Sequence, residues 1–452
     1  MKALILLYHR IAYPGVDPWS LCVTPERFSE HMEVLRRIAH PLSLTQLIRA
    51  RAAGAIPDGA VAVTFDDGYL DNLTNAKPIL DRHDVPATVF VCSGAVGREE
   101  EFWWDELDRA FFQSNKRVQG RLAFEVAGER FTWTFEDSTS AAEENASSPS
   151  GGQSPEALAL SACMTMWRAL RPLTHQDQAA AIRQIKTWAN LPDEPRPTHR
   201  PMNAYEIAAL TGGGLVEIGA HTVSHPLLPA HLREVQEREI LDSRTRLEEI
   251  VTYPIRHFAY PFGKYDGTSV DILRNAGFAS ACKTGGTGLT PRHGIYELPR
   301  LAVNNWSGDQ FAEIVQNLLN VPDSDLPFGA RVRFPLEAFK RRTGNLRNGA
   351  IECLPAKHRP GHCLFGPDFT IAESGQYRLG VELEQQDPED VVLDVYENDK
   401  TKQVLAETHP DSTSKLRLLE FSAQKGDVVE FRVYWHGRSH LTIRDIHLER
   451  LS

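Results

Sequence analysis

The sequence has little of what marks membrane, nucleic-acid-binding or disulfide-rich proteins. No apolar run approaches the roughly 20 residues that a bilayer-spanning helix needs. The formal net charge of −11 argues against a nucleic-acid binder, which would normally carry a basic patch or stripe. The six cysteines form no Cys-x-x-Cys pair, although Cys353 and Cys363 flank a loop and could be joined in an oxidising compartment.

The first residues also lack the features of a signal peptide. The apolar run after Met1 stops at His9, which is too short for a signal peptide's apolar core, and no small-residue cleavage site follows. This run is better interpreted as a first strand. We therefore expect a cytoplasmic protein.

The overall composition is that of a folded globular protein with more than one domain. Hydrophobic residues make up 42% and charged residues 24% of the chain. A length of 452 residues exceeds one ordinary core, so two or three domains are expected.

Apolar runs alternate with helical patterns over the first part of the chain. A helix is predicted after Thr24, where a capping hydroxyl precedes a proline and an acidic residue. Strands are predicted at residues 61–65 and 85–91, with a helix between them over residues 70–82. This alternation indicates a parallel sheet, either doubly wound or closed into a barrel. Both architectures bind ligands at the carboxyl ends of their strands.

The pattern is interrupted between residues 100 and 200, which we interpret as an insertion. It contains a predicted hairpin over residues 121–136, a Ser/Ala/Glu/Gly-rich disordered loop over 137–155 and a helix near 178–189. Two aromatic residues near its start, Trp103 and Trp104, either stack on a sugar ring at the mouth of a site or belong to the core of the insertion.

The alternation resumes at about residue 204 and ends near residue 320. From about residue 330 short strands alternate with Gly, Asp and Pro turns, as is typical of an all-β sandwich. The sequence thus predicts a catalytic α/β domain over residues 1–322 and a β-sandwich accessory domain over residues 330–452.

Two adjacent carboxylates end the buried strand at residues 61–65. Asp66 and Asp67 repel one another there unless a cation lies nearby, and Gly68 allows a tight turn beside them. Taken alone, the Asp-Asp-Gly sequence is more often a surface turn that leads into a helix.

Two histidines follow a second predicted strand, over residues 215–220. His221 and His225 are four residues apart, a spacing that metal-binding helices use but that also occurs in caps and cores. Because both strands belong to one parallel sheet, the histidines and the carboxylates can reach the same pocket. One carboxylate with two imidazoles makes a three-ligand metal site with an open position, and the second carboxylate is free to act as a general base.

Three sequence segments in this order resemble the successive motifs of the polysaccharide deacetylases, the NodB-homology domain of carbohydrate esterase family 4. They are Thr64-Phe65-Asp66-Asp67-Gly68, His221-Thr222-Val223-Ser224-His225 and Tyr260-Pro261-Phe262-Gly263. The resemblance extends from about residue 1 to residue 320, apart from the insertion. It implies a distorted (β/α) barrel that removes N-acetyl groups from amino sugars with a divalent metal, commonly zinc.

The resemblance also implies a role for each motif residue. Asp67, His221 and His225 would hold the metal, which we expect to be Zn²⁺, with Co²⁺, Ni²⁺ or Mn²⁺ as alternatives, and Asp66 would be the base. The third motif, with Tyr260, Pro261 and Phe262, would contribute to substrate binding. Trp103 and Trp104 of the insertion, which lies outside the resemblance, are further candidates for substrate binding.

The sequence departs from the family pattern at two positions, so other residues must supply the partner of the base and the general acid. The third-motif arginine that pairs with the base in many members is replaced by Ala259, and Arg300 is the candidate substitute. Many members also carry a late histidine as the general acid, but this sequence has no convincing late Leu-x-His. In the branch that resembles exopolysaccharide deacetylases, an early Tyr-His supplies it, which here is Tyr8-His9.

The sequence therefore predicts a metal-dependent N-deacetylase acting on an N-acetylated glycan or on a lipid- or nucleotide-linked precursor. Alternatives are a deformylase or O-acetyl esterase with the same site, and a glycan-binding protein with a degenerate catalytic domain. Two histidines and one carboxylate also suit a non-haem iron oxygenase, but the adjacent second carboxylate disfavours it. The C-terminal sandwich resembles carbohydrate-binding modules only in outline, so a structural or oligomerising role stays open.

Overall fold

A computed structural model describes most of the chain. The described residues are 3–113, 120–126, 128–135, 155–286, 288–290, 293–320, 331–334, 336, 339, 341, 343–347, 350–371, 374–385, 387–397, 403–408, 415–424 and 427–451. The predicted disordered loop, apart from Pro155, and the junction of the two predicted domains over residues 322–330 lie outside them. No helix of the described part of the chain has both the length and the apolar character that crossing a membrane requires.

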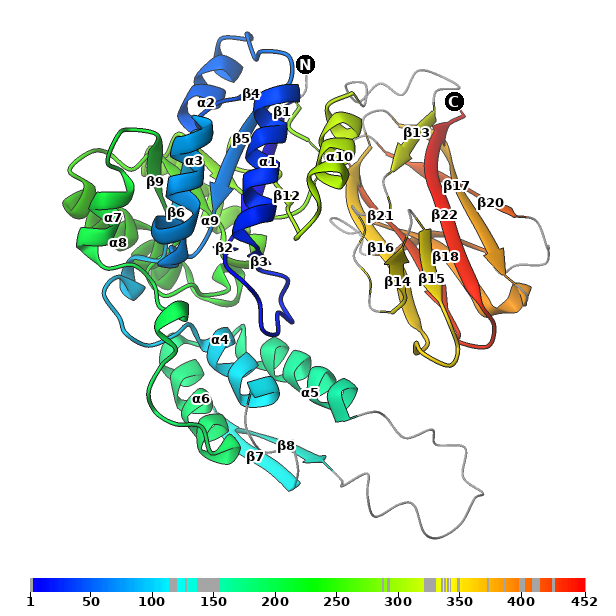
Figure 1. Cartoon of the computed structure of the whole chain (residues 1–452), viewed down its shortest axis with the longest axis horizontal. Helices are drawn as coiled ribbons and strands as arrows, with labels where there is room; N and C mark the ends of the chain where they lie inside the picture. Colours follow the sequence, from blue (N-terminus) through cyan, green and yellow to red (C-terminus); the bar gives the residue numbers. More distant parts are fainter. Residues whose placement is uncertain are drawn as a thin grey trace.

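The N-terminal part is built around a parallel sheet in the order β11-β10-β9-β6-β5-β1-β12, with β4 beside β5 (Figure 1). Its strands are β1 (Ala3–Tyr8), β4 (His40–Pro41), β5 (Ala60–Phe65), β6 (Ala87–Val91), β9 (Val216–Ala220), β10 (His257–Ala259), β11 (Ser280–Cys282) and β12 (Leu301–Ala302). Leu298 bonds to β11 and Leu301 pairs with Leu6 of β1, so one segment joins the two ends of the sheet. The sheet is therefore a distorted (β/α) barrel, as predicted.

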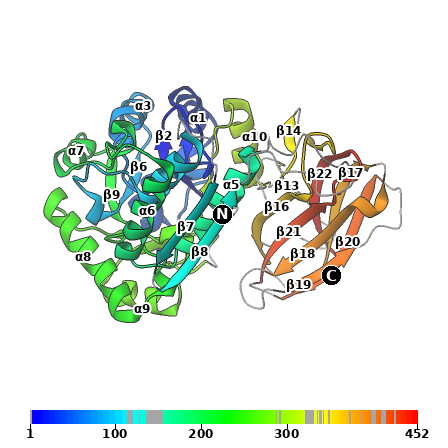
Figure 2. The same cartoon turned by 90° about the horizontal axis from the view of Figure 1, so that it is seen from below.

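The described α-helices of this part lie around the strands (Figure 2). They are α1 (Pro25–Ile38), α2 (Leu44–Ala52), α3 (Lys77–His83), α7 (Ala204–Leu210), α8 (Arg233–Val251), α9 (Gly267–Asn275) and α10 (Gly308–Asn320). The predicted start of α1 is present: the Thr24 hydroxyl accepts a hydrogen bond from the Arg27 N–H, and Pro25 is the first helical residue.

Strand register places the predicted site residues at one edge of the barrel. Every residue of β1 and β5 is buried, as expected for strands covered on both faces. Tyr8 pairs with Phe65, so the residues that follow the two strands, His9 and Asp66, leave the sheet side by side. In the same way Val91 of β6 pairs with Ala220 of β9, the residue before His221.

The insertion forms a separate layer beyond this edge of the barrel (Figure 1). Its elements are α4 (Trp103–Asp108), the π-helical turn η3 (Arg109–Gln113), β7 (Gly120–Val126), β8 (Glu129–Phe135), α5 (Pro155–Leu170), α6 (His175–Ala189) and the 3₁₀ turn η4 (Pro197–His199). Its helices and hairpin bury a core of their own, which includes Trp103, Leu107, Cys163 and Ile185. The predicted hairpin and helix are both present.

The C-terminal part consists of two packed antiparallel sheets, as predicted. One has the order β14-β15-β22-β17-β20 with β13 on β22, and the other the order β16-β21-β18-β19. The strands are β13 (Arg331–Phe334), β14 (Asn345–Arg347), β15 (Ala350–Cys353), β16 (Gly361–Thr370), β17 (Gly375–Gln385), β18 (Val391–Glu397), β19 (Val404–Thr408), β20 (Leu416–Ala423), β21 (Val428–Trp435) and β22 (Leu441–Arg450). Alternate residues of β20 and β21 are buried, which is the pattern of strands with one face on a core. Cys353 and Cys363 are buried free thiols in this core.

Candidate metal centre and active site

An arginine neutralises the first carboxylate at the end of β5. The Arg300 guanidinium donates from Nη1 to Asp66 Oδ1 at 2.7 Å and from Nη2 to Asp66 Oδ2 at 2.6 Å. Two further hydrogen bonds, to Thr64 Oγ1 and to the Lys283 carbonyl, fix its plane. Burial alone would raise the pKa of Asp66, but Arg300 and His221 outweigh it and lower that pKa to about 2. Asp66 is therefore ionised at neutral pH.

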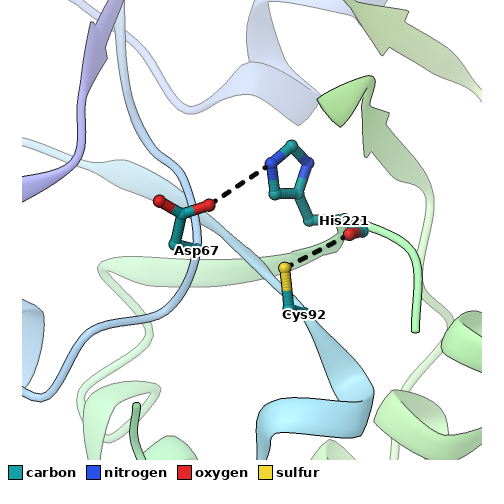
Figure 3. A group of neighbouring side chains, drawn as sticks. All are labelled: Asp67, Cys92 and His221. Carbon is teal, nitrogen blue, oxygen red and sulfur yellow. Dashed lines mark hydrogen bonds and ion pairs between the residues drawn. The ribbon is translucent and has the colours of Figure 1, made fainter. Parts of the chain in front are cut away.

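The second carboxylate faces two imidazoles instead. Asp67 Oδ1 lies 3.6 Å from His221 Nε2 and 3.5 Å from His225 Nε2. Figure 3 shows the Asp67 carboxylate and the His221 ring pointing toward each other; they follow β5 and β9, the strands on either side of β6. The structure thus brings together the three side chains that the sequence selected as metal ligands.

Hydrogen bonding sets which nitrogen of His221 faces Asp67. His221 Nδ1 lies 2.7 Å from the Ala259 carbonyl oxygen, which can only accept, so Nδ1 carries the proton and Nε2 presents its lone pair. Burial lowers the pKa of His221 and, together with the neighbouring His221, that of His225. Both rings are therefore neutral at pH 7, the form that binds metals.

These donors fit a divalent cation. Asp67 Oδ1 is buried and has no hydrogen-bond partner, although a buried polar atom without a partner costs about 1–3 kcal/mol. Without a cation, burial and the charge of Asp66 raise the pKa of Asp67 well above its ordinary value. A cation held between Oδ1 and the two Nε2 atoms would satisfy all three groups, and one carboxylate with two imidazoles suits zinc and related metals.

Cys92 lies beside this group and was not singled out from the sequence. Its Sγ belongs to a cluster with Asp67 and His221 whose ligand atoms all lie within 4.8 Å of one another. The thiol donates to the His221 carbonyl at 3.4 Å (Figure 3), and burial raises its pKa, so it stays protonated. A protonated thiol is a poor ligand, which leaves the two imidazoles and Asp67 as the better donor set.

The loops that carry the ligands have strained backbone conformations. Asp67, Thr222, His225 and Phe262 all have positive φ, at 73°, 67°, 60° and 58°. Such conformations cost non-glycine residues on the order of 1–3 kcal/mol each and cluster at functional sites. The strain supports a functional role for this edge of the barrel.

Glu239 of α8 holds the loop between the two histidines. Its carboxylate accepts hydrogen bonds from the backbone N–H groups of Val223 and Ser224, both at 2.8 Å, and from the Ser224 hydroxyl. No sequence signal marks Glu239, because it is one of several charged residues on a long helix. It is a positioning residue that sequence reasoning missed.

His9 lies next to the pair of Asp66 and Arg300. It follows β1 directly, and its carbonyl accepts a hydrogen bond from Asn72 Nδ2. Burial lowers the pKa of its imidazole to about 4, while the charge of Asp66 acts in the opposite direction. His9 is therefore neutral at pH 7 and within electrostatic reach of Asp66, Arg300 and His221.

The predicted substrate-binding aromatics Trp103, Trp104 and Phe262 pack on the His225 ring or within the core of the insertion. Trp104 and Phe262 pack on the His225 ring, with centroids 4.6 Å and 4.5 Å away. Trp103 is only 8% exposed in the core of the insertion, and Trp104, only 4% exposed, is also stacked on Phe102. Neither tryptophan offers a free face to a sugar, which favours the alternative that they are core aromatics.

The other residues of the third motif also point away from an open site. Tyr260 is fully buried, stacks on Tyr265 and donates its hydroxyl hydrogen bond to the Tyr296 carbonyl. Pro261 is buried as well, whereas Phe262 and Gly263 are partly exposed. The structural reason is that β10 ends at Ala259 and the chain turns back at once through a 3₁₀ turn.

Several known proteins are similar to this chain. In sequence, 113 residues are 27% identical to the Bacillus subtilis (strain 168) protein named "Putative polysaccharide deacetylase YxkH", which is 24% of this chain and 37% of that relative. In structure, the chain is similar to the Streptococcus pyogenes deacetylase PplD in complex with acetate (TM-score 0.45, 17% identity, 70% of this chain and 98% of that one). It is also similar to IcaB from Ammonifex degensii (TM-score 0.42, 18% identity, 70% and 97%).

A family model for polysaccharide deacetylases matches two segments of the sequence. They are residues 53–116 and 166–281. The gap between them falls in the insertion, and the segments contain Asp66, Asp67, His221 and His225. Over these two segments the chain is similar to the polysaccharide deacetylases, the resemblance that its motifs predicted.

Proposed function

We propose that this chain is a metal-dependent hydrolase that removes N-acetyl groups from amino sugars of a glycan, or of a lipid- or nucleotide-linked precursor. One observation carries the proposal. A buried carboxylate paired with arginine, Asp66, lies directly beside an unpartnered carboxylate oxygen of Asp67 that faces two neutral imidazoles. Asp67 is thus available to bind a cation, and Asp66 is available to accept a proton.

Asp67, His221 and His225 would hold the metal. When bound, a divalent ion acidifies a water molecule and polarises the acetamido carbonyl. The hydrogen bond from His221 Nδ1 to Ala259 and the clamp of Glu239 on the intervening loop keep both Nε2 atoms directed at one point. Zinc fits the donor set best, with cobalt, nickel and manganese as alternatives.

Asp66 would accept the proton of the attacking water. Arg300 keeps Asp66 ionised and fixes its orientation, so an acceptor is always available next to the cation site. Water adds to the carbonyl carbon, the C–N bond breaks, and the products are a free amine and acetic acid, which ionises to acetate by releasing the second proton of the water. The amine nitrogen must gain one proton, the same number that Asp66 takes up.

His9 would deliver that proton to the leaving amine. It is neutral at rest, because burial lowers its pKa to about 4, so it must first be protonated during the reaction. The charge of Asp66 favours the protonated form of His9. His9 would therefore pass the proton from the Asp66 carboxyl group to the leaving amine.

Two variants separate these roles. Asp66→Asn should retain one metal ion per chain but lose acetate release, because the amide cannot accept the proton. His9→Ala should slow the chemical step and leave metal binding nearly unchanged. Metal content by atomic absorption and acetate release from N-acetylglucosamine oligomers measure both, and normal turnover by either variant would remove that residue from its proposed role.

A further inference from the structure

A cavity with both charged and apolar lining residues lies between the insertion and the loop that joins β2 (Arg10–Ile11) to β3 (Cys22–Val23). Its volume is about 470 Å³, enough for one sugar ring. Figure 1 shows this loop reaching from the barrel toward α4, and Trp19 Nε1 donates to the Trp104 carbonyl where they meet. The residues used below, Arg10, Asp17, Trp19, Asp105, Asp108 and Arg196, all line it.

The two arginines of this cavity already have carboxylate partners outside its lining. Arg10 donates from Nε to Asp71 at 3.0 Å. Arg196 donates from Nε and Nη2 to Glu101, which also lies 3.6 Å from Arg109. These bonds direct both guanidinium groups toward carboxylates outside the cavity, although Arg196 Nη1 has no hydrogen-bond partner.

Three carboxylates line the cavity. Asp17 accepts hydrogen bonds from two backbone N–H groups of its own loop, and Asp105 accepts one from the Tyr69 hydroxyl. Asp108 Oδ1, by contrast, is buried without any hydrogen-bond partner, and the whole residue is only 4% exposed. Its nearest cation is Arg196, whose Nη1 lies 3.7 Å from Oδ2, beyond hydrogen-bonding distance.

This arrangement is complementary to a cation that can donate hydrogen bonds. Burial raises the pKa of both Asp105 and Asp108 to about 7, although Arg10 and Arg196 oppose the rise, so each carboxylate lacks an adequate counter-charge. A compact ammonium group would supply both the charge and the missing donor to Asp108 Oδ1. The indole ring of Trp19 adds an apolar surface of the kind on which a sugar ring packs.

The cavity is also close to the metal centre. Tyr69, two residues beyond Asp67, holds its hydroxyl between Asp105 Oδ2 at 2.7 Å and Trp104 Nε1 at 2.8 Å. Trp104 also contacts the metal site, because its ring packs on His225. Adjacent residues of α4 thus line the cavity and support the metal centre.

We propose that this cavity binds the ammonium group of a deacetylated hexosamine, with Asp108 as its principal partner and Asp105 as its neighbour. The inference rests on the proposed function, since deacetylation produces this amine. A glycan with some acetyl groups already removed would be held by its free amino sugar while another residue is presented for hydrolysis.

Calorimetric titration of the zinc-loaded full chain tests the proposal with three disaccharides. They are the β-1,4-linked dimer of glucosamine, its di-N-acetyl counterpart, and cellobiose, which has a hydroxyl in place of each amine. Asp108→Asn removes the charge, and Glu106→Gln is the matched control, because Glu106 is on the same helix but pairs with Lys186. Thermal unfolding checks that both variants are folded.

The glucosamine dimer should bind the wild type and Glu106→Gln at least about tenfold more tightly than it binds Asp108→Asn. The di-N-acetyl dimer and cellobiose should show no such difference. Equal affinity of Asp108→Asn and the wild type for the glucosamine dimer would overturn the proposal. So would a wild type that binds the glucosamine dimer no better than cellobiose, a comparison that needs no variant.

Acetate release by the wild type is measured separately and tests the proposed function alone. Amine binding that depends on Asp108 in a protein that releases no acetate would refute the catalytic proposal and leave the cavity assignment standing. Acetate release by a protein that binds the glucosamine dimer no better than cellobiose would support the catalytic proposal and overturn the cavity assignment.

Discussion

Arg300 links stability and chemistry at the scale of a single residue. It is completely buried and makes two hydrogen bonds to Asp66, of 2.7 and 2.6 Å. Removing one member of a buried ion pair costs about 3–5 kcal/mol, because the other charge stays behind without a partner. A lysine at this position would keep the charge but lose the two-point contact.

We therefore expect Arg300→Lys to lower kcat by about tenfold or more at unchanged metal content, since Asp66 would be less firmly oriented. Steady-state kinetics with metal analysis tests this expectation. Arg256→Lys, at an exposed arginine just before β10, is the matched control and should behave like the wild type. An Arg300→Lys enzyme with normal kcat would show that the pair is structural only.

His31 gives a second residue-scale test, on pH and stability. It lies fully buried between the Tyr8 hydroxyl at Nδ1 and the Trp306 carbonyl at Nε2, and its ring stacks on Phe311. Burial lowers its pKa from the ordinary 6.5 to about 4. Between these values only the unfolded state binds the proton, so stability falls as the pH falls from 6.5 to 4.

His31→Gln should remove this part of the acid sensitivity, because an amide offers a donor and an acceptor but does not titrate there. The wild type should lose about 3 kcal/mol more than the variant over this range, an order-of-magnitude figure. Urea unfolding at pH 7.0 and 4.5 measures the difference, with the exposed His40→Gln as control. A parallel decline of wild type and His31→Gln would contradict the assignment.

At the scale of elements, Glu239 shows how one helix holds the loop of another segment. The Glu239 carboxylate accepts hydrogen bonds from the N–H groups of Val223 and Ser224. These two residues lie between the two histidines and next to the strained Thr222. Groups that orient metal ligands in this way typically contribute 10–100-fold to metal affinity.

Glu239→Gln should therefore weaken zinc binding by about 10–100-fold, since an amide N–H would face a backbone N–H. Competition with a chromophoric chelator measures the affinity. Glu237→Gln, at an exposed residue of the same helix, is the control. If both variants bound zinc equally well, Glu239 would have no part in positioning the ligands.

The arrangement of strand ends was predictable from sequence, whereas contacts across the barrel edge were not. Apolar runs that end at Asp66 and His221 place both motifs at the same edge, because parallel strands share their carboxyl ends. Arg300 was selected as the candidate partner of the base, and in the structure it directly precedes β12, which covers only Leu301–Ala302. The pattern could not reveal that one segment closes the barrel there.

Side-chain environments were the least predictable feature. The sequence left two interpretations of Trp103 and Trp104, and only packing within the insertion distinguishes them. Glu239 and Asp108 resemble ordinary surface acids in sequence. Their roles depend on tertiary contacts that bring a loop or a cavity to them.

At the scale of the whole molecule, the two predicted domains have separate cores. The barrel strands and helices bury one set of residues, and the two C-terminal sheets bury another that includes Ile351, Phe431 and Trp435. Because a ligand stabilises only the unit that binds it, metal should act on one of these cores alone.

Calorimetry should therefore resolve two unfolding transitions, and removal of metal should lower only one midpoint. At zinc a hundred times its dissociation constant, the lost stabilisation is about 2.7 kcal/mol. The domain boundary proposed at residues 322–330 would be wrong if metal removal shifted both transitions equally.

The most direct test of the central claim is acetate release by metal-stripped protein before and after zinc or cobalt is restored. N-acetylglucosamine oligomers and UDP-linked N-acetyl sugars serve as substrates, so that polymer and precursor are compared. We predict stoichiometric metal binding, release that appears only with metal, and no release by Asp66→Asn despite bound metal. A chain that neither binds a divalent metal nor releases acetate from any of these substrates would contradict the account.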